Sequence, residues 1–185
     1  ESIKEGSSID SLRENGNDID IELFKKWCRQ IFGCIKIGTD EQLEIVKKFI
    51  SEELYNKFTF QIKQFEKDGL QFITEDLMIN ECKIYDYSKS LNKEEIIVYI
   101  DSMMKEYIIS KNDNKIIRGN KEKFKNKRVL MTFSKKENLS KEGIIYNCPN
   151  CGGKLDNPEF GKCKYCNTLI FPIRYNWTLT KFETI

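Results

Sequence analysis

The run EEIIVYIDSMMKEYIIS, residues 94–110, decides the fold. Apolar Ile, Val and Tyr alternate there with polar residues, the period of a strand whose successive side chains point to opposite faces. The stretches LMINECKIYDY (77–87) and KRVLMTFSKK (127–136) follow the same style and predict two more long strands. Residues 111–114, Lys-Asn-Asp-Asn, predict a hairpin turn, since Asn and Asp tolerate left-handed backbone angles. We therefore expect an antiparallel meander in this part of the chain.

The segment before Gly69 has helical spacing instead. From Asp20 to Gly38, apolar residues recur at steps of three and four, which predicts an amphipathic helix that ends at the glycine. Thr39 and Gln42 have the spacing of a capping box, so a second helix begins there and continues towards Gly69. We expect a break midway, because one helix of that length is unusual in a globular domain. Helices first and strands afterwards indicate an α+β fold, with N-terminal helices packed on a curved antiparallel sheet and a small zinc ribbon after it.

Composition divides the chain into three parts. Residues 1–19 combine Gly, Ser and Asn with few apolar side chains, which predicts a flexible acidic lead-in. Residues 20–138 carry the helices and strands of the α+β domain. Residues 143–185 contain four cysteines and end in an apolar run. A segment of about forty residues cannot bury enough surface alone, and a metal is the usual remedy at that size.

Four cysteines within CPNCGGKLDNPEFGKCKYC, residues 148–166, supply metal-binding chemistry. They form two Cys-x-x-Cys pairs, and the Gly or Asn after each pair allows the tight turn of a metal knuckle. Two facing knuckles give tetrahedral four-thiolate coordination, the closed geometry of a structural zinc site. We expect one structural zinc ion, with iron in the same cage and a redox dithiol as alternatives. The expected ligands are Cys148, Cys151, Cys163 and Cys166.

The composition also removes several function classes. The chain has no histidine, which excludes the commonest general base and the Ser-His and Cys-His nucleophile pairs. Its 31 basic and 29 acidic residues leave a net charge of +2, which gives no argument for a nucleic-acid partner. The cysteines number seven, an odd total, and the two close pairs have knuckle spacing, which favours a reducing compartment over a secreted disulfide framework. Cys28, Cys34 and Cys82 lie on apolar faces and are expected to be small buried hydrophobes.

Lysines alternate within KEKFKNK, at Lys121, Lys123, Lys125 and Lys127. On a strand these four side chains share one face. One explanation is a solvated edge strand that lysine protects against unwanted pairing, and this explanation is favoured. The other is a surface that contacts anionic lipid.

A curved sheet covered by helices often encloses a cavity, and strand residues near its centre are candidates to line it. The candidates are Tyr85, Tyr99, Asp101 and Met103. An Asp beside Tyr can transfer protons without histidine, so Asp101 is the first candidate for a carboxylate enzyme. Core packing is the favoured role for all four.

The order of parts resembles the Tim44-like domain family. The resemblance rests on FKKWCRQIFGCIKIGTDEQLEIVKKFISEELYNKF, IIVYIDSMMKEYIIS, DNKIIRGN and RVLMTFSKK, and on the cysteine motif with the trailing NWTLTKFE, which is similar to the zinc ribbon of bacterial members. It implies a cone-like fold of the nuclear transport factor two kind with a hydrophobic cavity. It implies a binding or tethering role at a membrane, with no established reaction. An import-motor role is not carried over, because residues 1–19 match no chaperone-binding segment.

The leading hypothesis is a non-enzymatic, zinc-stabilised binding or tethering module, membrane-associated, with protein or anionic lipid as partner. The alternatives are an enzyme that uses a carboxylate in the cone cavity and a zinc ribbon that binds nucleic acid. No stretch approaches the ~20 consecutive apolar residues of a membrane helix, so no transmembrane segment is expected within this chain. We expect the cytoplasm or the cytoplasmic face of a bacterial membrane, with any anchor upstream of Glu1.

Overall fold

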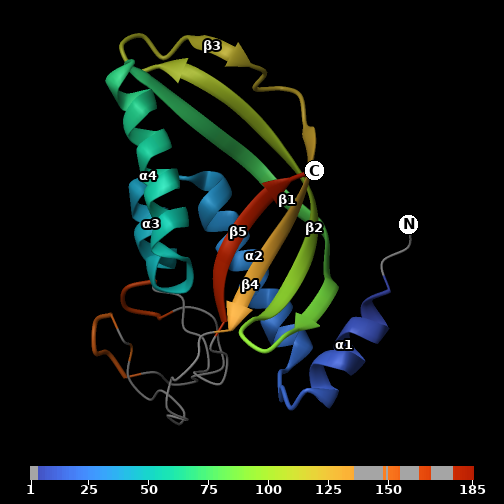
Figure 1. Ribbon diagram of the computed structural model, residues 1–185. Coiled ribbons are helices and arrows are strands. Elements are labelled where there is room, and N and C mark those ends of the chain that lie inside the picture. The colour runs from blue at the N-terminus through green and yellow to red at the C-terminus, as the bar shows by residue number, and fades with distance from the viewer. Residues whose placement is uncertain (1–3, 136–147, 149, 155–162, 168–176) are drawn as a thin grey trace.

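The computed structural model describes residues 4–135, 148, 150–154, 163–167 and 177–185. Helices lie on one side of a strongly curved antiparallel sheet, as the sequence predicts (Figure 1). The helical elements are α1 (Glu5–Glu14), α2 (Ile21–Ile37), α3 (Asp40–Val46), the 3-10 turn η1 (Lys47–Phe49) and α4 (Glu52–Lys67). The strands are β1 (Leu70–Lys89), β2 (Glu94–Ser110), β3 (Ile116–Gly119), β4 (Lys125–Lys135) and β5 (Trp177–Thr184). The α+β class is confirmed.

Short polar side chains begin the helices. The Asp20 carboxylate caps α2, and Thr39 Oγ1 accepts a hydrogen bond from the Gln42 amide to cap α3. Gly38 ends α2 with φ 63°, a left-handed conformation that glycine adopts without strain. The expected midway break is present, since η1 ends α3 and Ser51 caps α4 separately. Among the described residues, no helix has both the length and the apolar character needed to span a bilayer.

The central strand β2 organises the sheet. It pairs with β1 along its whole length, and on its other side with β4 and then β3, so the strand order is β1-β2-β4-β5 with β3 also on β2. Register shifts interrupt β1 at three places, between Glu75 and Met78, Ile79 and Glu81, and Ile84 and Asp86. Such bulges bend a strand and increase its twist, which lets the sheet curve around α2.

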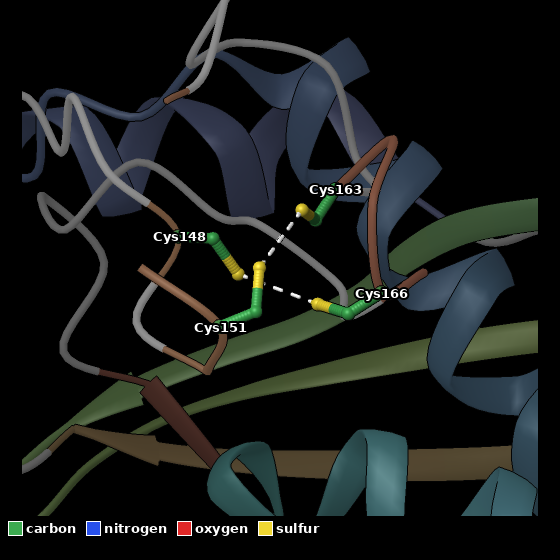
Figure 2. A group of neighbouring side chains, drawn as sticks. All are labelled: Cys148, Cys151, Cys163 and Cys166. Atoms are coloured by element: carbon green, nitrogen blue, oxygen red, sulfur yellow. Dashed lines mark hydrogen bonds between the residues drawn. The ribbon is translucent and has the colours of Figure 1, made fainter. Parts of the chain in front are cut away.

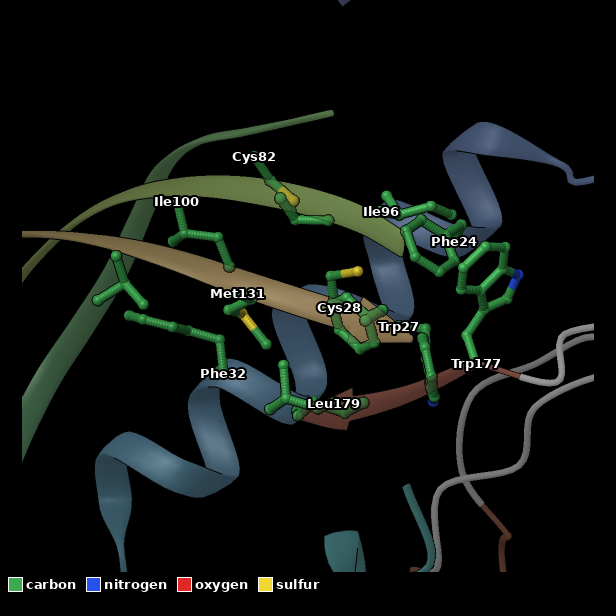
Figure 3. Close-up of a cluster of buried hydrophobic side chains, with 14 of the residues drawn as sticks. Phe24, Trp27, Cys28, Phe32, Cys82, Ile96, Ile100, Met131, Trp177 and Leu179 are labelled. Atoms are coloured by element: carbon green, nitrogen blue, oxygen red, sulfur yellow. The ribbon is translucent and has the colours of Figure 1, made fainter. Parts of the chain in front are cut away.

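The core lies between α2 and the concave face of the sheet (Figure 3). Phe24 and Trp27 of α2 pack on Phe133 of β4, with ring centroids 5.5 and 5.2 Å from it. Cys28 and Cys82 are buried in the same cluster, as expected, and burial raises the pKa of both thiols, that of Cys82 to about 11. These cysteines therefore remain protonated packing residues at neutral pH.

The expectation of little order before Asp20 is wrong for the helix α1. Leu12 is fully buried in the core cluster, and Glu5 bridges two elements. The Glu5 carboxylate accepts the Ile84 amide of β1 at 2.9 Å and pairs with Lys25 of α2 at 2.6 Å. The composition of residues 1–19 led to a wrong prediction, because a helix that covers only the edge of a sheet can be held in place by few apolar residues.

A buried polar cluster fastens the end of α1 to the sheet. The Asn17 amide donates to Glu94 at 2.7 Å and accepts from the Lys135 ammonium at 2.8 Å. The Tyr87 hydroxyl also donates to Glu94, at 2.7 Å. Burial opposes ionisation of Glu94, but these donors and the nearby Lys135 outweigh it and lower the pKa of the carboxyl. The cluster joins the segment after α1 to β1, β2 and the last residue of β4.

The assignment of residues 143–185 to one separate ribbon is wrong at its C-terminal end. The run from Trp177 to Thr184 is β5, which pairs antiparallel with β4 from Lys135↔Trp177 to Val129↔Thr184. Trp177 and Leu179 are buried in the main core. The reason is the alternation of WTLTKF, which suits a sheet edge with one buried face. The cysteine motif is therefore inserted between two neighbouring strands of the domain.

Leu12→Ala tests whether α1 belongs to the fold. We expect the free energy of unfolding to fall by about 2–4 kcal/mol, since a buried leucine is replaced by a cavity. Urea unfolding followed by circular dichroism measures it. Leu91→Ala is the control, because Leu91 is fully exposed in the β1–β2 turn. Equal stability of both variants would mean that α1 is not packed on the sheet.

Candidate metal centre and apolar groove

The four predicted cysteines converge on one point. Figure 2 shows their side chains pointing toward one another, and all four sulfurs lie within 4.8 Å of each other. The sulfurs of Cys148 and Cys166 are 3.6 Å apart, and those of Cys151 and Cys163 are 3.7 Å apart. A tetrahedral zinc ion with four Zn–S bonds of about 2.3 Å requires sulfurs about 3.8 Å apart. The cluster therefore has the donor type and spacing to hold a metal ion.

Each half of the cluster is a knuckle of the predicted kind. The Asn150 amide lies 3.4 Å from Cys148 Sγ, and the Tyr165 amide 3.4 Å from Cys163 Sγ. Gly152 and Asn167 close the two turns with φ 72° and 57°, as expected for residues that tolerate left-handed angles. The amides point at the sulfurs and so stabilise thiolate charge.

The cysteine cluster lies beside the helical layer. A cavity of about 430 Å³ lies between α3 and the knuckles. Glu41, Glu44 and Lys47 line it from the helical side, and Cys166 and Asn167 from the knuckle side. In Figure 1 the cysteine segments lie at the end of the molecule opposite β3.

A second feature is an apolar groove beside α4. Its volume is about 820 Å³, and it lies between α4, the C-terminal end of α2, the start of β1 and the end of β5. Its apolar side chains are Ile35, Leu43, Phe58, Phe60, Ile62, Phe65, Phe72 and Phe182. Phe60 is 62% exposed, although it is a large aromatic side chain. We call this feature the apolar groove.

The apolar groove continues towards the β2–β3 turn. A neighbouring cavity of about 210 Å³ shares Gly38, Ile62, Phe65 and Phe72 with it and ends at Lys111. Phe58 and Phe182 form the other end with an edge-to-face contact at 5.8 Å. The open surface thus runs from β5 to the tip of the sheet.

The structure does not bring the four predicted cavity residues into the apolar groove. Val98 and Ile100 of β2 are buried on the concave face, so Tyr99, Asp101 and Met103, which alternate with them, face the other way. Tyr85 is 43% exposed, on a strand whose concave side is occupied by Ile84. The groove lies on the helical side instead.

The four predicted lysines do not share one strand face. Lys125 and Lys127 lie in β4, but Lys121 and Lys123 precede the strand in a turn that Asn120 closes by accepting the Glu122 and Lys123 amides. Lys127 is pulled inward to the buried Glu106, at 3.3 Å. The Asx turn at Asn120 sets the direction of this segment, and the alternation of lysines in the sequence does not reveal that turn.

Sequence reasoning missed Glu106 and the apolar groove. Glu106 lies on the concave face, where Lys36 of α2 approaches it at 2.8 Å. Burial opposes its ionisation, but hydrogen bonds and charge from Lys36 and Lys127 prevail and lower its pKa. A signal for the groove was available, since Phe60 widens the aromatic stripe of α4 beyond the face that Leu54 and Phe58 bury.

Comparison with known proteins identifies a family. The profile of the Tim44-like domain matches residues 6–144, more than half of the chain. No curated protein matches the sequence. Among solved structures, the intermembrane space region of the chloroplast protein ARC6 is similar, with 7% sequence identity and a TM-score of 0.44, over 90% of this chain and 97% of that one. That likeness is too weak to carry an argument.

Cys163→Ser tests the metal centre. We expect loss of bound metal and a lower melting temperature, since one of four thiolates is removed and metal binding contributes folding free energy. Elemental analysis of the purified chain measures the metal. Cys82→Ser is the matched control and should keep its metal, because Cys82 lies in the sheet core. Unchanged metal content in Cys163→Ser would contradict the four-cysteine site.

Glu106→Gln tests the buried ion-pair cluster. We expect the free energy of unfolding at pH 7 to fall by about 3–5 kcal/mol, because Lys36 would lose its buried partner. The pKa of Glu106 is lower when folded than when unfolded, so its contribution is complete above the unfolded value and disappears as pH falls through the folded one. Unfolding of both proteins from pH 7 to 3 should show their difference shrinking below about pH 4. Glu44→Gln, in an exposed pair, should change stability by less than about 1 kcal/mol.

Proposed function

The chain belongs to the Tim44-like domain family, and from that premise we propose that it is a non-enzymatic, zinc-stabilised binding module that works at a membrane. The observation that carries the proposal is the apolar groove, an open surface lined by aromatic side chains beside α4. Its volume falls within the ~300–1,000 Å³ of ordinary ligand sites. Its ligand is a lipid chain or an apolar segment of a partner protein.

Zinc is the metal that the cysteine cluster suits best. Four thiolates in a closed tetrahedral arrangement are typical of structural zinc, and amides directed at the sulfurs complete the coordination environment. Sulfurs of the two knuckles approach one another to 3.6 and 3.7 Å, so the site draws its ligands from both Cys-x-x-Cys pairs. A redox dithiol needs only one such pair. The proposed ligands are Cys148, Cys151, Cys163 and Cys166.

The apolar groove supports a binding role because aromatic side chains of its lining are open to solvent. Phe60 and Phe72 are exposed aromatics, and both lysines and carboxylates stand at its borders. Such a site excludes water from an apolar guest and leaves polar groups at its edges for the guest's polar end. Its wall is completed by Phe182 of β5, the strand that follows the cysteine cluster.

The two alternative functions find less support in the arrangement. Asp101 faces away from the apolar groove, opposite Arg128 of β4, so it cannot act on a ligand in that groove. For nucleic acid, the cysteine cluster and the predicted lysines would need to form one surface, but they lie at opposite ends of the molecule (Figure 1). A four-thiolate site fits a reducing compartment, so we place the chain at the cytoplasmic face of a membrane.

The groove is tested with a fluorescent fatty-acid probe and the metal-loaded chain. We expect saturable binding that weakens roughly tenfold in the double variant Phe60→Gln and Phe72→Gln, since apolar contact area is lost. Tyr85→Gln is the control, because Tyr85 is a similarly exposed aromatic away from the groove. Equal affinity of both variants would contradict the groove as the binding site.

A further inference from the structure

The end of the sheet opposite the cysteine cluster carries a concentration of positive charge. Residues 111–125, which we call the basic tip, hold six basic and two acidic side chains. The other 25 basic and 27 acidic residues of the chain carry a net charge of −2, so the molecule is electrically polar. The tip comprises the β2–β3 turn, β3 and the connection to β4 (Figure 1).

Most of this charge is not neutralised locally. Lys111 pairs with Glu66 at 3.3 Å and Lys115 with Asp113 at 3.2 Å. Within the described part of the chain, no carboxylate oxygen comes within 4.0 Å of the remaining cationic groups of the tip. These groups are Arg118, Lys121, Lys123 and Lys125. They are available to an anionic surface.

Three large apolar side chains stand among these cations. Ile116 is 45% exposed, Ile117 59% and Phe124 41%. All four residues of β3 are exposed, so the strand projects with both faces uncovered. Apolar side chains ringed by basic ones match the interfacial region of an anionic bilayer, where apolar groups enter the acyl boundary and cations contact headgroups.

Protection of an edge strand does not explain this arrangement. Lysine and a short length protect an edge strand against unwanted pairing, but neither accounts for two exposed isoleucines on that strand. A second copy of the chain is disfavoured as the partner that covers the basic tip, because the positive charges of the two tips would repel each other. An anionic membrane satisfies both the charge and the apolar surface.

The fold holds the tip in one orientation. The left-handed Gly119 passes so close to β2 that a Cβ there would lie 2.5 Å from the Glu106 carbonyl oxygen. Asn120 closes the next turn, and the Lys105 ammonium lies 4.9 Å from the centre of the Phe124 ring while pairing with Asp76. A preorganised surface loses less conformational entropy on docking.

We propose that the basic tip docks on an anionic membrane, with Ile116, Ile117 and Phe124 entering the interface and Arg118, Lys121, Lys123 and Lys125 contacting the headgroups. The inference rests on the proposed membrane role and names the surface that performs it. Lys111 joins the tip to the apolar groove, so a docked membrane would face the open end of that groove.

Vesicle flotation of the metal-loaded chain tests the proposal. We expect binding to phosphatidylcholine vesicles that contain phosphatidylglycerol, none to phosphatidylcholine alone, and weaker binding at physiological than at low salt. Changing Lys121, Lys123 and Lys125 to Gln should weaken binding about a hundredfold, at about fivefold for each lysine. The matched control changes the exposed Lys48, Lys63 and Lys89 to Gln, with the same change in net charge.

A second measurement separates apolar entry from charge attraction. In Phe124→Trp, the added indole should shift its emission to the blue with anionic vesicles and be quenched by brominated lipid. The native Trp27 and Trp177 are only 2% and 4% exposed and provide a constant background. Leu91→Trp, at the fully exposed β1–β2 turn, should show no shift. Ile116→Ser with Ile117→Ser should weaken flotation while leaving the melting temperature unchanged.

The outcomes distinguish this inference from the proposed function. If anionic vesicles bind the tip variants as well as the control, the tip proposal is wrong and the membrane role stands on another surface. If neither the unchanged chain nor any variant binds vesicles, the membrane role is wrong as well. The fatty-acid assay tests the groove independently of that result. If the tip variants abolish self-association in sedimentation instead, a second copy covers the tip and the proposal is overturned.

Discussion

The pairing of β5 with β4 is the constraint on which the rest of the structure depends. The chain leaves the sheet after Lys135 and returns to the same place at Trp177, with the four cysteines in between. Closing a long connection costs conformational entropy, and a metal bound by both knuckles would reduce that cost. Metal binding and the β4–β5 pairing would then stabilise each other.

What β5 contributes explains why this matters beyond the sheet itself. Leu179 is buried in the core, and its carbonyl accepts the Ser51 amide at 2.8 Å, at the start of α4. Phe182 stacks on Phe32 of α2 and meets Phe58 of α4. One edge strand thus positions α4 and forms the wall of the apolar groove, although it lies beyond the range matched by the family profile.

Local signals in the sequence predicted local structure well. Gly38, Thr39 and the alternation of residues 94–110 each act within a few residues, and they give the helix end, the helix cap and the central strand that the structure contains. The two Cys-x-x-Cys pairs likewise predicted the convergence of four sulfurs, because each knuckle is built by its own turn. Zinc itself stays a prediction.

Apart from the lysine segment, where a local Asx turn decides the direction, the errors concern which distant surface a segment meets. Composition could not show that Glu5 would satisfy the backbone of β1, or that Trp177 would join the sheet across the cysteine insertion. Asp101 follows the buried Ile100 on the same strand and therefore points to the opposite face. Alternation alone predicts that the two faces differ, but not which face the helices cover. Glu106 could not be identified as half of a buried ion pair from the sequence around it, because its partner Lys36 is seventy positions away.

The position of β5 after the cysteines has a consequence for synthesis. During translation, the helices and the first four strands emerge from the ribosome before the cysteine knuckles, and β5 emerges only after them. Until then, β4 presents an unpaired edge and α4 lacks the partner that fixes its start. The nascent chain thus completes its groove only after the cysteines have emerged, and until then the open edge of β4 can pair with other chains.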